Sequence, residues 1–342
     1  MIQENFSLRA LNTFGIEAHA RFYAPFYKVE GLLELLNFVR ANRLPLLVLG
    51  GGSNVLFTKD FDGVVLHNRI SGKRIVQEED EWVWIEAAAG ENWHELVMWT
   101  IDHELGGLEN LSLIPGYAGA APIQNIGAYG VELKEVFHSL EAVEISTGKI
   151  FSFTAAECRF GYRDSVFKRE GRNQFIITNI TLRLQNMRCG KPYHYRVEYG
   201  DIAKQLEVMG VQQLSPRAVS EAIIAIRRSK LPDPSELGNA GSFFKNPLVS
   251  AAHYAQIVAE YGQTPHYPAE DGKVKIPAAW LIEKCGWKGK RVGNTGSHSR
   301  QALVLVNYGG ATGKEIWECA LQIQQSVKEK FGIALEPEVN VY

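Results

Sequence analysis

The stretch LPLLVLGGGSNVLF, Leu44–Phe57, decides the fold. It begins with an apolar run that matches a short buried strand, and residues 28–42 before it carry apolar side chains at helical spacing. Glycines placed directly after a strand let the backbone approach a ligand and align its N–H groups along a phosphate. We therefore predict a pyrophosphate cradle, although a tight turn between two strands explains lone glycines equally well. The predicted cradle residues are Gly50, Gly51, Gly52, Ser53 and Asn54.

This cradle does not match the common nucleotide-binding motifs. No third glycine follows at the spacing of the dinucleotide-binding fingerprint, and no lysine follows at the P-loop spacing. The usual NAD and ATP folds are therefore not predicted.

A second glycine-rich segment, IPGYAGAAPIQNIGAYG at Ile114–Gly130, is long, small in its side chains and almost uncharged. Compact domains rarely have structureless connections of this length unless they serve a function. A loop rich in amides and backbone groups suits a flat heterocycle, so the two segments together predict FAD held in a non-Rossmann fold. The cofactor-binding candidates in this segment are Gly116, Gly119, Pro122, Gln124, Asn125, Gly127 and Gly130.

The rest of the chain predicts an α+β protein. Residues 92–107 form an amphipathic helix pattern that ends at Gly106 and Gly107, and residues 140–154 alternate like a hairpin around Thr147 and Gly148. A further strand is predicted over Phe175–Leu184. From Ser215 onward helical patterns dominate, and Pro232 and Pro234 mark an internal boundary.

Composition excludes several classes of protein. There are 36 basic and 38 acidic side chains and a net charge of -2, so no charge excess favours nucleic acid or a membrane surface. The four cysteines show no CxxC pair, which excludes zinc clusters and favours a reducing compartment. The histidines lack ligand spacing, so no metal site is predicted. With no targeting or transmembrane pattern, a soluble cytoplasmic protein is expected.

Three segments in the second half of the chain carry candidate polar groups. GNAGSFFKNP, Gly238–Pro247, places Ser242, Lys245 and Asn246 beside a phenylalanine pair that is either a dry wall or simply core. On an extended CRFGYRDS segment, Arg159 and Arg163 would share a face, and a guanidinium is well suited to hold a carboxylate. A surface arginine paired with Asp164 or Glu157 is the blander alternative.

Two further groups of residues can be interpreted either as functional or as ordinary surface and helix-end residues. In the predicted final strand LEPEVNVY, Glu336, Glu338 and Asn340 share one face, which by default is solvated. Near the end of the helix predicted from Ser215, Arg227 and Lys230 either bind phosphates or complement the helix C-terminus.

Taken in order along the chain, these motifs resemble the UDP-N-acetylenolpyruvoylglucosamine reductase family. The segment PYHYRVEYGD around Tyr199 resembles the longer form of these enzymes, in which a tyrosine-bearing loop covers the substrate. Ala120 and Ala121 stand where many relatives carry a hydroxyl residue, so only backbone contacts to FAD are expected there. The matching motifs are NTFGI at Asn12–Ile16, GGGSNVLF at Gly50–Phe57, GLENLSLIPG at Gly107–Gly116, PIQNIGAYG at Pro122–Gly130, FGYRDS at Phe160–Ser165, KLPDP at Lys230–Pro234, GNAGSFFKNP at Gly238–Pro247 and LEPEV at Leu335–Val339.

The resemblance implies a fold and a domain plan. It implies a two-lobed FAD-binding domain of the vanillyl-alcohol-oxidase type followed by a smaller α+β substrate-binding domain. The expected boundaries are residues 1–67 and 68–214 for the two FAD-binding lobes, and residues 215–342 for the substrate domain, whose last strand returns to the active site.

The resemblance also implies a reaction: hydride passes from NADPH through non-covalent FAD to the enolpyruvyl ether of a UDP-sugar in bacterial cell-wall synthesis. It assigns Arg163 and Glu338 to the substrate carboxylate and the enolic intermediate, and Ser242 to the proton transfer. A serine hydroxyl is a weak acid and needs an activating neighbour or a water, and Glu338 helps only if it is protonated or positions another donor. The expected substrate-binding residues are Tyr199, Lys230, Asn246, Arg227 and Gln301.

Two other functions are compatible with the same residues. One is a flavin oxidase of the same FAD-binding class that acts on a sugar or hydroxy acid, and the other is a UDP-sugar-binding module without flavin. The sequence shows no histidine or cysteine positioned for covalent flavin attachment at the glycine segments, which favours reversible FAD. A monomer is expected, with NADPH and the enolpyruvyl UDP-sugar as its partners and no nucleic acid or membrane among them.

Overall fold

The computed structural model describes residues 2–342 and divides them into two compact units. Unit 1 comprises residues 2–6, 20–51 and 62–229, and unit 2 comprises residues 7–19, 52–61 and 230–342. The chain therefore passes between the units inside the first glycine segment, between Gly51 and Gly52. The three-part division expected from the sequence stays a prediction, since compactness alone groups residues 215–229 with unit 1.

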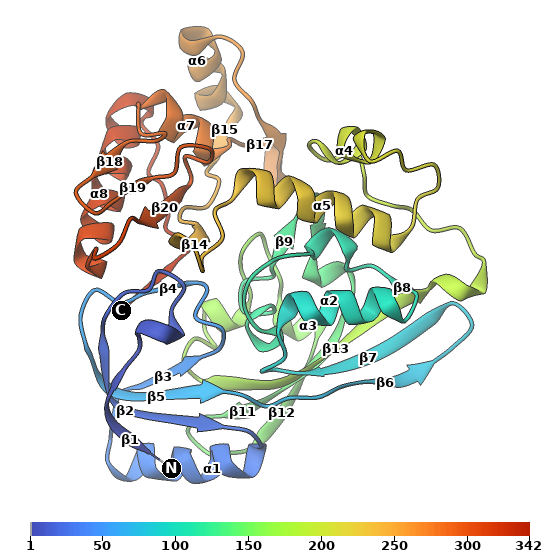
Figure 1. Cartoon of the computed structure of the whole chain (residues 1–342), viewed down its shortest axis with the longest axis vertical. Coiled ribbons are helices and arrows are strands. Elements are labelled where there is room, and N and C mark those ends of the chain that lie inside the picture. The colour runs from blue at the N-terminus through green and yellow to red at the C-terminus, as the bar shows by residue number, and fades with distance from the viewer. Residues whose placement is uncertain (1) are drawn as a thin grey trace. The chain divides into compact units, whose positions relative to one another are not determined.

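Unit 1 begins with a four-stranded sheet in the order β1-β2-β5-β3 that helix α1 covers on one face (Figure 1). Leu32, Leu36 and Val39 of the helix pack against Val64 and Leu66 of the sheet, which confirms the helix predicted from apolar spacing. The elements are β1 (Gln3–Ser7), β2 (His19–Phe26), α1 (Val29–Ala41), β3 (Leu46–Leu49) and β5 (Phe61–Asn68).

Unit 1 also contains a larger antiparallel sheet in the order β12-β11-β13-β7-β6, with β8 pairing to β13. Its central strand is the predicted apolar strand, and β11 with β12 is the predicted hairpin. The strands are β6 (Lys73–Glu78), β7 (Trp82–Ala88), β8 (Leu105–Gly106), β11 (Phe137–Glu144), β12 (Ile150–Thr154) and β13 (Phe175–Asn186).

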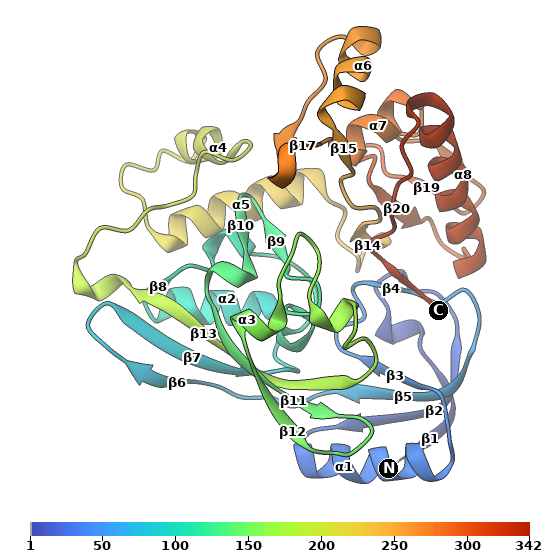
Figure 2. The same cartoon turned by 180° about the vertical axis from the view of Figure 1, so that it is seen from behind.

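The helices of unit 1 include one that is shorter than the sequence predicts. Helix α2 ends at Asp102 rather than at Gly106, because Glu104 adopts a left-handed φ of 55° and Leu105–Gly106 pair with β13 instead. Helices α4 and α5 lie side by side in both views and share a small apolar cluster of their own (Figure 2). The helices are α2 (Trp93–Asp102), α3 (Ala155–Cys158), α4 (Ile202–Val208) and α5 (Pro216–Lys230).

Unit 2 contains a four-stranded sheet in the order β14-β20-β19-β18, a three-stranded sheet and the helices predicted for it. Phe243 and Phe244 are fully buried in its core, so the core interpretation of this pair is confirmed. The elements are β14 (Gly238–Ser242), β15 (Leu248–Ser250), α6 (Ala251–Tyr261), β16 (Tyr267–Pro268), β17 (Lys273–Lys275), α7 (Ala278–Lys284), β18 (Arg291–Val292), β19 (Thr295–Ser297), β20 (Val304–Asn307) and α8 (Gly313–Phe331).

The last residues of unit 2 are less regular than the predicted strand. Only β21 (Asn340–Val341) is a strand, and it pairs in parallel with β4 (Val55–Leu56). The preceding residues are extended and pair with residues 243–245, because Glu338 N–H donates to Phe243 O at 2.8 Å and Lys245 N–H donates to Glu336 O at 2.9 Å.

Thr13 of the NTFGI motif joins two distant parts of unit 2 through its backbone. Its N–H donates to Gly52 O at 3.1 Å, and its carbonyl accepts from Asn239 N–H at 3.0 Å. Asn307 adds a third tie, because its Nδ2 donates to Phe14 O at 2.9 Å. The first glycine segment and β14 are therefore both fastened to the same N-terminal turn.

None of the helices within residues 2–342 combines the length and the apolar character that crossing a membrane requires. In the same residues no three or more histidine, cysteine or acidic side chains gather as metal ligands.

Gly52→Ala is expected to destabilise the chain strongly. The glycine has a φ of 62°, and an added Cβ would lie 1.9 Å from Leu11 O. Left-handed strain and this backbone clash together are expected to cost at least ~2 kcal/mol. Urea unfolding of Gly210→Ala is the matched control, because Gly210 has a φ of 68° with open space around it. Equal losses in the two variants would contradict the clash at Leu11.

Candidate functional site

The first glycine segment meets the second in unit 1. A Cβ on Gly51 would lie 3.0 Å from Gly116 Cα, and one on Gly50 would lie 3.5 Å from the Tyr117 side chain. The segments that the sequence predicts to hold the two ends of one cofactor are thus packed against each other. The backbone of Gly116 already fills the space beside Gly51, so chain packing alone explains why this residue is a glycine. A role for Gly51 in ligand binding therefore stays a prediction.

The second segment is ordered by backbone hydrogen bonds to the connection between β7 and α2. Gly119 N–H donates to Ala89 O at 2.9 Å, and Trp93 N–H donates to Gly116 O at 3.0 Å. A Cβ on Gly119 would fall 2.4 Å from Ala89 Cβ, so only glycine fits there. Pro122 is buried, and Gln124 is partly buried in the same turn. These contacts give the segment a defined conformation, so it is not a flexible connection.

Asn125 holds the second half of this segment in place. Its side chain is fully buried, its Nδ2 donates to Gly161 O at 3.0 Å and to Glu132 Oε2 at 2.9 Å, and its Oδ1 accepts from Lys134 N–H at 3.0 Å. The short hairpin of β9 (Gly127–Ala128) and β10 (Val131–Glu132) follows directly. The Asn125 side chain therefore has a structural role, which is to hold the loop in its conformation.

The structure corrects the predicted geometry of the arginine segment. Arg159 and Arg163 do not share a face of an extended strand, because both have left-handed backbone and reciprocal hydrogen bonds between Gly161 and Asp164 close a turn between them. Arg159 forms a surface ion pair with Glu170. Arg163 instead donates from Nη2 to Gly127 O at 2.6 Å.

A cationic cluster lies where Arg163, Arg227 and Tyr129 meet in unit 1. Arg227 Nε is buried and has no hydrogen-bond partner within residues 2–342. Burial lowers the pKa of Arg227, the nearby Arg163 charge lowers it further, and the Tyr129 phenol oxygen that accepts its hydrogen bond opposes both. Two neighbouring guanidinium groups repel each other, so this cluster favours a bound anion.

The tyrosine segment is fastened to unit 1 at its base. The Tyr193 hydroxyl donates to Glu109 Oε1 at 2.5 Å, and the Asn110 amide donates to Arg196 O at 2.8 Å and to Tyr129 O at 3.0 Å. Glu109 and Asn110 are both buried, and they come from the matching GLENLSLIPG motif. Tyr199 follows, with its ring edge-to-face against Tyr129 at 6.4 Å between centroids. One asparagine thus couples the tyrosine segment to the second glycine segment.

In unit 2, Ser242 and Glu338 come from neighbouring segments. Glu338 pairs through its backbone with Phe243, the residue after Ser242. Ser242 is exposed and Glu338 is half-buried. Asn54 of the first glycine segment donates from Nδ2 to Glu338 O at 3.2 Å, and its own carbonyl accepts from Asn340 N–H at 3.1 Å. Three of the residues predicted from separate motifs are therefore brought together in one unit.

Several polar groups of Gly238–Pro247 have structural partners. Lys245 pairs with Glu336 at 2.5 Å, Asn239 donates to Pro232 O and Leu237 O, and Asn246 Oδ1 accepts from Ala278 N–H at 2.9 Å at the start of α7. All three side chains therefore have structural partners within unit 2. Substrate binding by Asn246 stays a prediction.

Lys230 and Gln301 also lie in unit 2. Lys230 is exposed at the end of α5, and Gln301 is half-buried, with its Oε1 accepting from Leu303 N–H at 3.4 Å. Their roles in substrate binding stay predictions.

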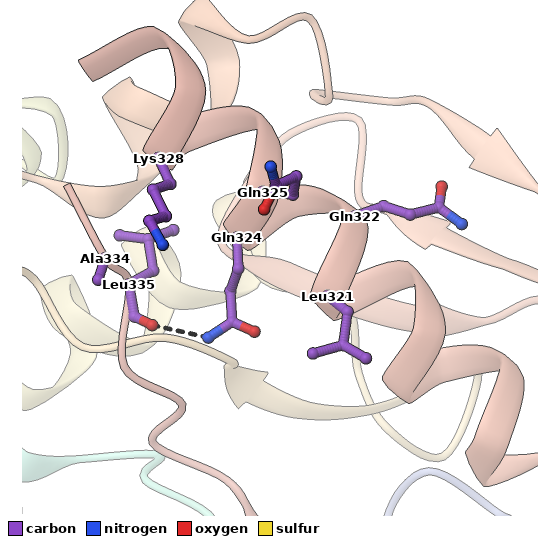
Figure 3. A pocket seen from close by; sticks show the side chains of 7 residues that line it. All are labelled: Leu321, Gln322, Gln324, Gln325, Lys328, Ala334 and Leu335. Atoms are coloured by element: carbon purple, nitrogen blue, oxygen red, sulfur yellow. Dashed lines mark hydrogen bonds between the residues drawn. The ribbon is translucent and has the colours of Figure 1, made fainter. Parts of the chain in front are cut away.

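A pocket of about 510 Å³ lies elsewhere in unit 2, against the last turns of α8 (Figure 3). Gln324 Nε2 donates to Leu335 O at 2.7 Å across it. None of the predicted site residues lines it, and Lys328 is its one charged lining residue, so it is not the candidate site.

Sequence reasoning missed four residues that the structure brings to the candidate site. Glu109 and Asn110 stand in a quoted motif, yet nothing in their spacing indicates that they hold another segment. Tyr129 stands among the glycines of the second segment, where its hydroxyl was not singled out. His67 interrupts the apolar run GVVLHN, and a polar residue in a buried strand was the available indication.

The fold and the glycine segments define the class of protein as a flavoprotein with an FAD-binding domain. Residues 25–154 match the family profile described as FAD binding domain. This confirms the predicted α+β, non-Rossmann FAD-binding fold. The buried His67 Nε2, which makes no hydrogen bond to any of residues 2–342 and lies on the strand in register with Leu49 before the first glycine segment, is compatible with a cofactor that offers hydrogen-bond acceptors.

The chain belongs to the UDP-N-acetylenolpyruvoylglucosamine reductase family. Residues 233–342 match the profile described as the C-terminal domain of this enzyme. The reductase of Burkholderia ambifaria is 52% identical over 333 residues, which are 97% of this chain and 94% of that protein. The reductase of Flavobacterium johnsoniae is 49% identical over 340 residues, which are 99% of each chain. The family predicted from the sequence motifs is thereby confirmed.

A solved structure has the same fold. UDP-N-acetylenolpyruvylglucosamine reductase from Thermus caldophilus superposes with a TM-score of 0.64 at 23% identity, covering 100% of this chain and 98% of that one. At this identity the likeness concerns the fold.

Tyr193→Phe is expected to loosen the tyrosine segment. The substitution leaves the buried Glu109 carboxylate without its hydroxyl donor, which costs about 1–3 kcal/mol. Urea unfolding and faster amide hydrogen exchange over residues 192–201 measure the effect.

Tyr195→Phe is the matched control, since its hydroxyl makes no hydrogen bond to any of residues 2–342. If both variants exchange alike, the Glu109 contact does not fasten the segment.

Proposed function

We propose that the chain reduces UDP-N-acetylglucosamine enolpyruvate to UDP-N-acetylmuramate with NADPH, in the synthesis of peptidoglycan precursors. The observation that carries the proposal is family membership over nearly the full chain, together with Ser242, Glu338 and Arg163 at the matching motifs. Bacterial cell-wall growth, cell shape and division depend on this product. A cytoplasmic location and a monomeric state remain predictions.

FAD would be held without a covalent bond by the two glycine segments. When bound, FAD supplies the hydride, taken from NADPH, that adds to the methylene carbon of the enolpyruvyl group. The FAD-binding profile matched by residues 25–154 supports this assignment, because that range contains both glycine segments.

Arg163 would bind the substrate carboxylate. Negative charge builds on this carboxylate as the neighbouring carbon becomes enolic, and a guanidinium stabilises such charge best at close range. The contact of Arg163 with Gly127 O holds the side chain in place, so little ordering is needed on binding. Arg227 would add a second positive charge to the same cluster, and Tyr199 and Lys230 would contact the diphosphate and sugar.

Ser242 would deliver the proton that completes the reduction. Ser242 is exposed in unit 2, so water has access to it. Glu338 lies on the adjacent segment and would act either as a protonated donor or by orienting Ser242 or a water.

Ser242→Ala tests the central role. The purified protein is expected to be yellow, to bleach with NADPH and to regain colour with the enolpyruvyl UDP-sugar. The variant should bleach at the wild-type rate but be reoxidised roughly 10²–10⁴-fold more slowly, as measured by stopped-flow absorbance. Fast reoxidation would show that Ser242 is not the proton donor, and a colourless protein that binds no added FAD would remove the proposal altogether.

Glu338→Gln separates the two roles left open for Glu338. The glutamine amide still donates a hydrogen bond, but it has no negative charge with which to orient a neighbouring group. The variant should therefore keep substantial reoxidation activity if Glu338 acts as a hydrogen-bond donor, and little if its carboxylate positions another group. Glu336→Gln is the control, because Glu336 lies two residues away and pairs with Lys245. Equal rates in both variants would remove Glu338 from the chemistry.

Two alternative functions make different predictions in the same experiments. A flavin oxidase would form peroxide during turnover, and a UDP-sugar-binding module would bind nucleotide sugar without flavin absorbance. Neither is favoured by a specific observation in this structure.

A further inference from the structure

His67 lies in the interior of unit 1 beside the first glycine segment. It is 2% exposed, near the end of β5, and its backbone is in register with Leu49, the last residue before Gly50. The three residues before it, Val64–Leu66, are apolar and fully buried, so hydrophobic packing alone does not account for a histidine here.

The imidazole ring is fixed by two tyrosines. Tyr23 Oη lies 2.9 Å from His67 Nδ1, and the Tyr117 ring is nearly parallel to the imidazole, with 6.2 Å between centroids. Tyr117 also packs on the positions where Gly50 and Gly51 lack side chains. The Tyr117 ring therefore lies near both the imidazole and the residues predicted to receive a pyrophosphate.

The other ring nitrogen has no partner. His67 Nε2 is buried and makes no hydrogen bond to any of residues 2–342. Burial, helped by the Arg69 charge, lowers the pKa of His67 to about 4, so the imidazole is neutral at neutral pH. When the Tyr23 hydroxyl donates to Nδ1, the single proton of a neutral imidazole resides on Nε2. This leaves a buried N–H donor without an acceptor, which native structures rarely contain.

We propose that His67 is a cofactor-binding residue whose Nε2–H donates a hydrogen bond to the ADP half of FAD. The ADP half is chosen because the neighbouring Gly50 and Gly51 are the predicted diphosphate residues, and phosphate, ribose and adenine all offer acceptors. This inference rests on the proposed FAD-dependent function and adds a ligand that no glycine motif contains.

Binding measurements on the full chain, freed of FAD, test the proposal. His67→Phe keeps an aromatic ring beside Tyr117 but removes the donor. The dissociation constants of FAD and of ADP are expected to rise by a factor of about 3 to 10, and that of FMN, which lacks the AMP portion, is expected to change less than twofold. His67→Gln keeps an N–H donor and should recover part of the affinity.

His138→Phe is the matched control, because His138 is an exposed histidine of the same unit. Unchanged FAD and ADP affinities in His67→Phe would overturn the proposal, and so would an equal loss of FMN affinity. A wild-type chain that binds no FAD would instead overturn the proposed function, which keeps the two failures apart.

A measurement on the wild-type chain covers the case in which His67→Phe does not fold. With ¹⁵N-labelled histidine, the Nε2–H signal of His67 is expected to shift when ADP is added. A signal that stays unmoved at saturating ADP would also overturn the proposal.

Discussion

The backbone of Thr13 is the constraint on which unit 2 depends. One residue donates to Gly52 and accepts from Asn239, so the glycine segment that follows β3 and the strand that carries Ser242 are held by the same residue. Because these hydrogen bonds use only backbone groups, they tolerate a change of side chain but not a change in the backbone path. Gly52 and Gly238 meet this condition by lacking a Cβ, since one there would lie 1.9 Å from Leu11 O and 2.3 Å from Phe14 O, respectively.

Buried amides have a comparable role in unit 1. Asn125 and Asn110 each use their side chains to join segments that are remote in sequence, and neither leaves its amide group in an apolar environment without partners. Because an unsatisfied buried amide is costly, these contacts determine loop position more sharply than apolar packing does. The small side chains of Gly116–Gly130 allow the backbone to pack closely, and the hydrogen bonds of the Asn110 and Asn125 side-chain amides fix the position of that backbone.

Much of the fold follows from local pattern, while the geometry of the candidate site does not. Helix α1 and the β11–β12 hairpin are predicted correctly because the spacing of apolar residues indicates which face is buried. Arg163 is different: its direction depends on a left-handed turn that period-two spacing does not encode. The partners of Asn246 and Lys245 depend on segments 32 and 91 residues away, so no local motif indicates that these groups are already engaged. The order of family motifs does identify Ser242, Glu338 and Arg163 as candidates, since it carries information from outside the single chain.

The parallel pairing of β4 with β21 has a consequence for synthesis of the chain. Val55 and Leu56 are made early, but their strand partners Asn340 and Val341 are added only after residues 57–339. On the ribosome the early segments 7–19 and 52–61 must therefore wait for residues 230–341 before their own unit closes, while most of unit 1 has already emerged. Translation that stops short of Asn340 leaves β4 without the strand that pairs with it.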